Sequence, residues 1–552
     1  MPSPTPRRPL FKPTPCVGVR GLPLDNSPDD ELLYEEIDTD YPVPFSGSQA
    51  DLGLGLTWMS ADGRYGPYGF GEKSANYTRS KVDWDKVDWG ELMDACSAAN
   101  AHRFPQAPLT SRLASEPRFV LFNKSTAEAP PRWDQFSNTR RTMLILRSYD
   151  GFRFKPESMW YIRSLITEAS LRRGGEYSVV LLHNLKNLKP DIYKSKKAYD
   201  KVLDTVGIPP ELRSITVLWD DTLLKSWYAA VGEHRAMWQV NQPTQLFALF
   251  YPEYDHYWQI ELDIRFLGDA GEYLDAVSTS ARYEPRKQAL ERASFVYRTQ
   301  ESGTYKEFMS AVDKANGGQS RSWGPINVRE VTPIGPKPPV SNPDHDNFSW
   351  GVGEDADVIV TGPCGDARTT AWAFGGYVKG FGRGGNTPRF WCPPAIARAS
   401  RTLLHAIHAD QHLRGLAIPS ESVFPTWALW LGLKISFPPQ PAYMRGWTPR
   451  SEINNETSHQ SEPRRVKKPK KWFGFLPEES PDGMGWVNPQ SSANGGHTFW
   501  WGANYPRRIM DTWLSNKVNI AADSRGVGMP YMLRVKDGIV YAPNFAMHPV
   551  KK

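Results

Sequence analysis

The sequence predicts an α/β fold in which helices flank an open, mostly parallel sheet, with an irregular N-terminal arm and long loops around it. Two observations predict this class. Short apolar runs alternate with amphipathic segments between residues 140 and 263, and buried parallel strands are continuous apolar runs of this kind. A strand, a helix and a second strand in that order imply a right-handed crossover and therefore parallel pairing.

The first strand–helix–strand unit opens the predicted core. Residues 142–146 form an apolar run that ends in a polar turn, which predicts a buried strand. Pro156 can take the first position of the following helix, and the pair Gly174 and Gly175 supplies its end. The apolar run at 177–182 then predicts the second strand.

Two further strands continue the predicted sheet. Residues 215–219 are predicted to be the third strand, and 222–231 the helix after it. The apolar run at 257–260 predicts another strand, which Glu261 and Asp263 follow directly. In open α/β sheets ligands bind beyond the carboxyl ends of the strands, so these two acids are candidates for a functional site.

The chain divides into four predicted parts. An irregular arm covers residues 1–137, with one short helix at 82–98, and the first α/β half covers 138–300. A Pro- and Gly-rich insertion is predicted at 301–356. The second half covers 357–552 and includes a long polar loop at 449–496 and a C-terminal tail.

Local signals place the elements of the second half. Pro393 and Pro394 are predicted to open a helix, and Ser420 can cap the next one. Residues 433–437 are predicted to be a strand. A turn signal at 536–538 predicts a hairpin between the apolar runs on either side of it.

The composition is that of an ordinary globular chain. Of the 552 residues 40% are hydrophobic and 23% are charged, and the net charge is +6. The sequence shows no signal peptide and no apolar run of about 18 residues, so it predicts a soluble chain. The basic run at 464–471 is interpreted as a solvated loop, and nucleic acid is not expected as a partner. The four cysteines are compatible with two disulfides or with none.

The acidic pair Glu261 and Asp263 is the strongest candidate for chemistry. In an extended segment, residues two apart point to the same side, so both carboxylates can face one ligand. Mg²⁺ and Mn²⁺ are commonly held by one or two carboxylates together with substrate phosphates. The pair therefore predicts a divalent metal site at a strand end.

Two other motifs are set aside. Residues 380–385 match G-x-G-x-x-G, but no buried strand precedes them and no helix follows at once, which argues against a dinucleotide site. His405, His408 and His412 share one helix face, as zinc ligands could. No H-E-x-x-H arrangement accompanies them, so a core role is the preferred interpretation.

Two single residues allow two interpretations each. Glu421 follows Ser420 at a predicted helix start, where the helix dipole alone favours a carboxylate, but the same placement can aim a general base into a cleft. His548 lies close to the chain end, where residues are usually loose. An idle histidine and a metal ligand both remain open there.

Five segments resemble a fungal family of uncharacterised proteins, domain of unknown function 3405. The resemblance runs with gaps from about Cys16 to Lys551. The segments are CVGVRG at 16–21, RYGPYG at 64–69, LRSYDG at 146–151, YDHYWQIELDIR at 254–265 and HPVK at 548–551. The fourth segment is the most specific.

That family is in turn similar to glycosyltransferases of the GT-A fold, whose D-x-D motif binds a divalent metal and the diphosphate of a nucleotide sugar. The resemblance implies that Glu261 and Asp263 hold Mn²⁺ or Mg²⁺, that His548 is a further ligand, and that Glu421 is the catalytic base. The departure from the motif is Glu261, which replaces the first Asp. Contacts to the nucleotide are implied for Arg147, Tyr149, Asp150 and Arg265.

The expected function is therefore sugar transfer from a nucleotide-diphosphate donor to a glycan or protein acceptor, with residues 138–300 as the nucleotide-binding half. The Golgi or secretory lumen is the compartment that the resemblance implies, although no membrane anchor is visible. The main alternative is a non-catalytic binding or scaffold protein on the same fold. A third hypothesis is polyanion binding through residues 464–471.

Overall fold

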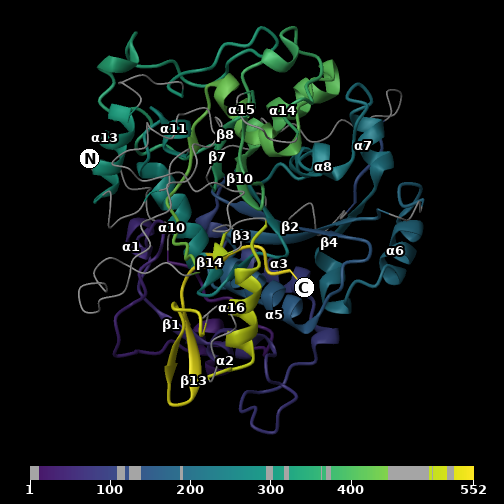
Figure 1. The fold of residues 1–552 in the computed structure, drawn as a ribbon. Coiled ribbons are helices and arrows are strands. Elements are labelled where there is room, and N and C mark those ends of the chain that lie inside the picture. Colours follow the sequence, from purple (N-terminus) through teal and green to yellow (C-terminus); the bar gives the residue numbers. More distant parts are fainter. Residues whose placement is uncertain are drawn as a thin grey trace.

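A computed structural model gives the arrangement of the elements (Figure 1). The residues that it describes are 12–107, 118–122, 139–186, 191–293, 297, 303–315, 322–361, 364–368, 374–445, 496–499, 502–518 and 528–551. The basic run at 464–471 therefore lies outside the described residues.

The strands are β1 Trp58–Ser60, β2 Thr142–Tyr149, β3 Tyr177–Asn184, β4 Thr216–Trp219, β5 His256–Glu261, β6 Arg265–Phe266, β7 Val358–Val360, β8 Gly365–Asp366, β9 Phe390–Trp391, β10 Ile396–Ser400, β11 Ile435–Ser436, β12 Arg534–Lys536, β13 Ile539–Pro543 and β14 Ala546–Met547. The helices are α1 Gln49–Leu52, α2 Ala61–Tyr65, α3 Trp89–Ala99, α5 Pro156–Leu165, α6 Lys196–Thr205, α7 Asp221–Trp227, α8 Ala236–Gln239, α9 Gln242–Phe250, α10 Ala270–Tyr283, α11 Ala289–Ala293, α13 Tyr305–Ala315, α14 Arg401–Arg414, α15 Ser420–Leu431 and α16 Tyr505–Leu514.

The largest sheet in the described part of the chain has seven strands in the order β11-β7-β10-β5-β2-β3-β4. Strands β5, β2, β3 and β4 pair in parallel, and so do β11 and β7. Strand β10 is antiparallel to both of its neighbours. The prediction of an α/β fold with a mostly parallel sheet is therefore confirmed.

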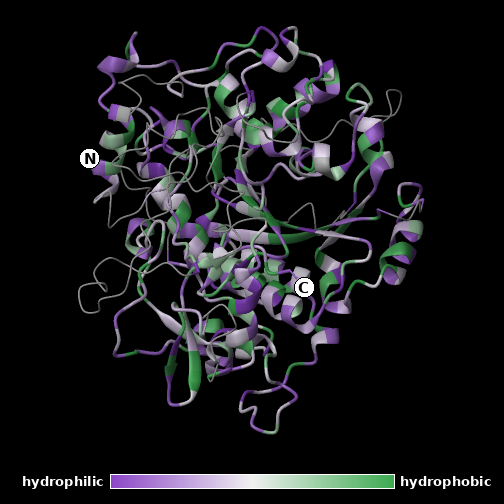
Figure 2. Ribbon diagram, viewed as in Figure 1, coloured by the Kyte–Doolittle hydropathy of each residue, from purple (hydrophilic) through white to green (hydrophobic). Residues whose placement is uncertain are grey.

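Each face of this sheet has its own core, because side chains alternate along a strand. Met143 and Ile145 of β2 pack with residues of α7, α9, α14 and α15. Leu144 and Leu146 pack with residues of α3, α5 and α10 on the other face. Figure 1 shows the sheet between these two helical layers, and Figure 2 shows hydrophobic residues along the central strands, whereas the outer helix α6 mixes both colours.

The N-terminal region is more ordered than the predicted irregular arm. Strand β1 joins β13 and β12 in a second sheet (Figure 1), and Cys16 and Cys96 form a disulfide. The predicted helix at 82–98 is shorter, since α3 begins after Asp88, whose carboxylate caps it by accepting from the Glu91 N–H at 2.9 Å. The region thus packs against both the core and the C-terminal tail.

The second half contains strands that the sequence prediction missed. The prediction that a helix begins at Pro393 and Pro394 is wrong, because β10 follows these prolines and α14 begins only after the Ser400 cap. Strand β7 was also missed, and α13 lies inside the predicted insertion. These elements depend on neighbouring strands and helices that are distant in sequence. A second disulfide joins Cys364 and Cys392.

Two smaller expectations are also corrected. Ser420 does not cap α15 but is its first residue, and its hydroxyl donates to the Ala236 carbonyl at 3.0 Å and accepts from the Val240 N–H at 3.0 Å. The predicted hairpin exists as β12 and β13, but its first strand begins at Arg534 rather than in the run at 531–533.

Candidate metal centre

The acidic pair occupies a tight turn at the carboxyl end of β5. Glu261 is the last residue of the strand, and its N–H donates to the Ala395 carbonyl at 3.0 Å. The guanidinium of Arg265 donates to the carbonyls of Leu262 at 2.6 Å and Ile264 at 2.7 Å. The turn that presents both carboxylates is therefore fixed by neighbouring backbone and by a buried arginine.

The C-terminal tail brings His548 to this turn. Strand β14 pairs with β6, the His548 N–H donates to the Thr498 carbonyl at 2.8 Å, and the Val550 N–H donates to the Asp263 carbonyl at 2.7 Å. His548 is only 4% exposed. The interpretation of His548 as an idle tail residue is therefore wrong, and the residue belongs to the site.

Three side chains that could hold a metal ion converge at this point. The Nε2 atom of His548 lies 3.2 Å from an oxygen of Glu261 and 3.5 Å from an oxygen of Asp263. One such atom from each residue lies within 4.8 Å of the others, and among the described residues no other set of His, Cys, Asp and Glu is grouped this closely. The spacing suits one shared cation.

Electrostatics keep the two carboxylates ionised. Burial alone would raise their pKa values, but the His548 imidazole lowers both, and Arg147 adds to this effect at Glu261. The result is a pKa below the usual range for Glu261 and a pKa of about 2 for Asp263. Burial would lower the pKa of His548, but the two carboxylates raise it. A cation binds the neutral imidazole, so a proton on His548 would compete with a metal ion for this site.

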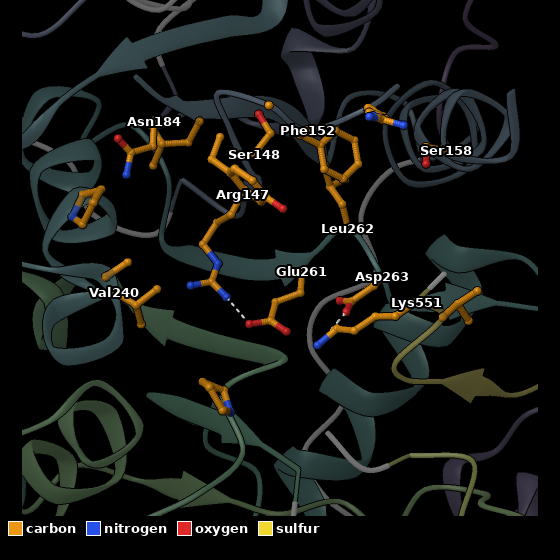
Figure 3. Close-up of a pocket in the computed structure, with 18 of the residues that line it drawn as sticks. Arg147, Ser148, Phe152, Ser158, Asn184, Val240, Glu261, Leu262, Asp263 and Lys551 are labelled. Atoms are coloured by element: carbon orange, nitrogen blue, oxygen red, sulfur yellow. Dashed lines mark hydrogen bonds and ion pairs between the residues drawn. The ribbon is translucent and has the colours of Figure 1, made fainter. Parts of the chain in front are cut away.

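The acids border a cavity of about 810 Å³ at the carboxyl ends of the parallel strands. Its wall includes Glu261, Asp263 and Glu421, so helix α15 faces the same space as β5. Figure 3 shows Arg147 beside Glu261, and Lys551 beside Asp263. The two carboxylates thus lie between two cationic side chains along this wall, and Mg²⁺ is commonly held by one or two carboxylates together with substrate phosphates.

Comparison with family models gives a match over residues 59–552 to the family described as "Protein of unknown function (DUF3405)". The chain belongs to this family. The comparison with curated proteins finds no match. No helix in the described part of this DUF3405 protein is both long enough and apolar enough to cross a membrane.

The four residues predicted to contact nucleotide differ in how they lie relative to the cavity of this DUF3405 protein. Arg147 lines the cavity but pairs with Glu261, with Nη2 at 2.5 Å from Oε1. Tyr149 lines it and is 50% exposed. Arg265 lines it too, but it is buried and its guanidinium holds the acidic turn. Asp150 does not line this cavity, although its neighbours Tyr149 and Gly151 do.

Several cavity residues were not predicted to be functional. The Nζ atom of Lys551 lies 3.4 Å from Asp263 Oδ2, and its place in the closing segment HPVK was the available signal. Asn184 and Trp219 are the last residues of β3 and β4, and both line the cavity. Their place near the end of a predicted strand was the available signal. The aromatic Trp258 of β5 does not line the cavity and is buried in the core beside α3, α5 and α10.

The two motifs that were set aside are the histidines of α14 and the glycine-rich run at 380–385. His408 Nδ1 lies 3.0 Å from the Tyr228 hydroxyl, and the rings of His408 and His412 stack at 5.3 Å. The histidine face of α14 therefore packs against the chain that follows α7, as the core interpretation predicted. Residues 380–385 run into a short 3₁₀ turn at Gly384–Asn386 and follow no strand of the described seven-stranded sheet.

Proposed function

We propose that this DUF3405 protein is a metal-dependent glycosyltransferase, which moves a sugar from a nucleotide-diphosphate donor to an acceptor hydroxyl. One observation carries the proposal. The carboxylates of Glu261 and Asp263 meet the imidazole of His548 at the carboxyl end of a parallel strand, beside a large cavity. Glu261 and His548 are 287 residues apart in the sequence. That edge of an open α/β sheet is where ligands bind.

The donor set fits a hard or borderline divalent cation. Mg²⁺ and Mn²⁺ prefer carboxylate oxygens and keep positions for water and substrate phosphates, and Mn²⁺ also accepts imidazole. Glu261, Asp263 and His548 would hold the ion. When bound, it would neutralise charge on the diphosphate as the leaving group departs.

The protein's own residues supply the remaining functions. Lys551 beside Asp263, and the exposed Arg153 and Lys155 on the cavity wall, would bind phosphate oxygens. Glu421 in the first turn of α15 faces the same cavity and would accept the proton of the acceptor hydroxyl in an inverting transfer. The sugar–phosphate bond breaks as the new glycosidic bond forms.

The two disulfides suit the proposed setting. Cys16–Cys96 and Cys364–Cys392 leave no free cysteine among the described residues. Disulfides persist in oxidising compartments and are rare in the cytosol. The proposal therefore places the enzyme in the secretory lumen, where glycans and proteins are the acceptors.

Calorimetry with UDP- and GDP-sugars in the presence of Mn²⁺ tests the donor and the metal together. We expect metal-dependent binding that Asp263→Ala abolishes and that the matched acid Asp150→Asn, outside the cavity, leaves intact. Glu421→Gln should retain donor binding but lower turnover by about 10²- to 10⁴-fold. Absence of heat with every sugar nucleotide, together with full function of Asp263→Ala, would refute the proposal.

A non-catalytic scaffold is the second candidate, and one observation favours it. His548 and Lys551 already neutralise the acidic pair by ion pairing, as a purely structural cluster would. This candidate predicts that Mn²⁺ and chelators leave the thermal midpoint unchanged. A metal-dependent rise in the midpoint that Asp263→Ala removes would exclude a purely structural cluster, and sugar transfer that Glu421→Gln reduces would exclude a non-catalytic protein.

A further inference from the structure

A row of three side chains crosses the parallel strands at the edge of the cavity. Tyr149 of β2 is in register with Asn184 of β3, which is in register with Trp219 of β4. Residues in register on parallel strands point to the same face of a sheet. All three line the cavity that also contains Glu261 and Asp263.

Two polar atoms in this row are buried and unpaired. Trp219 is only 7% exposed. Its indole N–H and the side-chain oxygen of Asn184 have no hydrogen-bond partner among the described residues. Buried polar groups are nearly always satisfied in native proteins, so such an atom needs an explanation. A ligand in the cavity that offers an acceptor to Trp219 and a donor to Asn184 would provide one.

The surroundings of these atoms suit a flat heterocycle. Leu182 lies two residues before Asn184 on the same face of β3, and Val240 and Pro243 form apolar wall on the α8–α9 side. Figure 3 shows Asn184 and Val240 on one side of Arg147, with Asp263 and Lys551 on the other. A nucleotide whose diphosphate lies at the acids would therefore direct its base toward Asn184.

We propose that Asn184 and Trp219 form a nucleobase subsite that selects a base with a carbonyl beside a ring N–H, namely uracil or guanine. This inference rests on the proposed nucleotide-dependent function. The ring N–H donates to the Asn184 oxygen, and the carbonyl accepts from both the Asn184 amide N–H and the Trp219 indole N–H. A carbonyl oxygen has two lone pairs for these donors. The ring nitrogen in the same place in adenine or cytosine has only one.

Binding of nucleoside diphosphates to the full chain tests this subsite. With Mn²⁺ present, UDP or GDP should bind at least about tenfold more tightly than ADP and CDP. Trp219→Phe keeps the ring but removes the donor, so it should weaken the preferred nucleotide about tenfold and leave inorganic pyrophosphate binding unchanged. Asn184→Asp distinguishes the two bases, because a carboxylate can accept both N–H groups of guanine but cannot donate to uracil.

Trp258→Phe is the matched control. Its indole N–H is also buried and unpaired among the described residues, but it lies in the core on the other face of the sheet. It should leave nucleotide binding unchanged. Equal affinity for the four nucleotides, or full affinity in Trp219→Phe, would overturn the subsite while the metal–diphosphate site could stand. Failure of pyrophosphate and of all four nucleotides to bind would overturn both proposals.

Discussion

His548 is the residue on which the candidate metal centre depends most. It lies between two carboxylates that would otherwise repel each other, and both are held in the tight turn after β5. The buried tail also fixes its position from behind, through the Thr498 carbonyl. A small change at this position should therefore alter metal binding without rebuilding the cavity.

We predict that His548→Gln weakens Mn²⁺ binding on the order of 10- to 100-fold or more, since even loss of a supporting group around a metal has this effect. Titration calorimetry with Mn²⁺ alone would measure the change. His345→Ala is the control, because His345 is exposed at the end of a short 3₁₀ helix, Pro343–His345. Unchanged affinity in His548→Gln would show that the imidazole is a structural partner of the acids and no ligand.

Part of this site could be predicted from single residues. Glu261 and Asp263 follow an apolar strand, and strand ends are where ligands bind, so the pair was found. His548 needed the family resemblance, because its burial is produced by β14 pairing with β6 and leaves no local signal. Asn184 and Trp219 read as ordinary strand residues. Their unpaired state depends on neighbours from other elements.

At the scale of elements, helix α14 carries a pH-sensitive set of buried histidines. Burial lowers the pKa of His405 to about 4 and that of His408 to about 3. In an unfolded chain both would titrate near 6.5. The folded state therefore keeps them neutral, and stability that is complete above pH 6.5 is lost as the pH falls toward 4.

As the pH falls through that window, the free energy of unfolding should decrease by up to about 1.4 kcal/mol per pH unit for each of these histidines. Urea unfolding at pH 7 and pH 5 measures the loss. The double variant His405→Gln with His408→Gln should show a flatter pH dependence than the natural chain. An identical slope in both proteins would mean that other groups control acid unfolding.

The Cys16–Cys96 disulfide ties the N-terminal segment to α3 across 80 residues. Replacing both cysteines with serine should lower the free energy of unfolding by about 4 kcal/mol, mainly by releasing the unfolded chain. The Cys364–Cys392 bridge spans only 28 residues, so its removal should have a somewhat smaller effect. Urea unfolding of the two double variants tests this order, and the reverse order would contradict the chain-entropy account.

Element prediction succeeded where the pattern was local. The runs that form β2, β3 and β4 are continuous and apolar, so the sequence alone indicated that these strands are buried on both faces. Strand β10 was missed because its sequence, IARAS, has no apolar run and alternates only through the small residues Ala397 and Ala399. Its strand state comes from antiparallel pairing with β5 on one side and β7 on the other, which no local signal reveals.

At the scale of the whole molecule, a third core joins the two ends of the described chain. Tyr65 from the N-terminal region packs with Trp513 of α16 and Val540 of β13. The same cluster includes Met547, the neighbour of His548. Ala546, the other residue of β14, packs in the core beside α3, α5 and α10. The candidate metal centre thus depends on the third core as well as on one core of the main sheet, and the sequence division into an arm and a tail concealed this connection.

This arrangement predicts that damage to the third core disables the metal centre before the sheet unfolds. Trp513 is fully buried, and its indole N–H donates to the Met59 carbonyl at 3.0 Å. Trp513→Ala should cost about 3–5 kcal/mol and should open residues 539–551 locally, because such clusters can unfold as separate units. Hydrogen exchange of that segment and Mn²⁺ affinity at 25 °C would report the change.

The matched control lies in the core on the α15 side of the sheet. Trp430 is equally buried, and its indole N–H donates to the Pro388 carbonyl at 2.9 Å. Trp430→Ala should cost a similar amount but should leave Mn²⁺ affinity intact while the protein stays folded, because that core does not hold the tail. If both variants lost Mn²⁺ affinity equally, the three cores would unfold as one unit, and the separate control of His548 by the third core would be wrong.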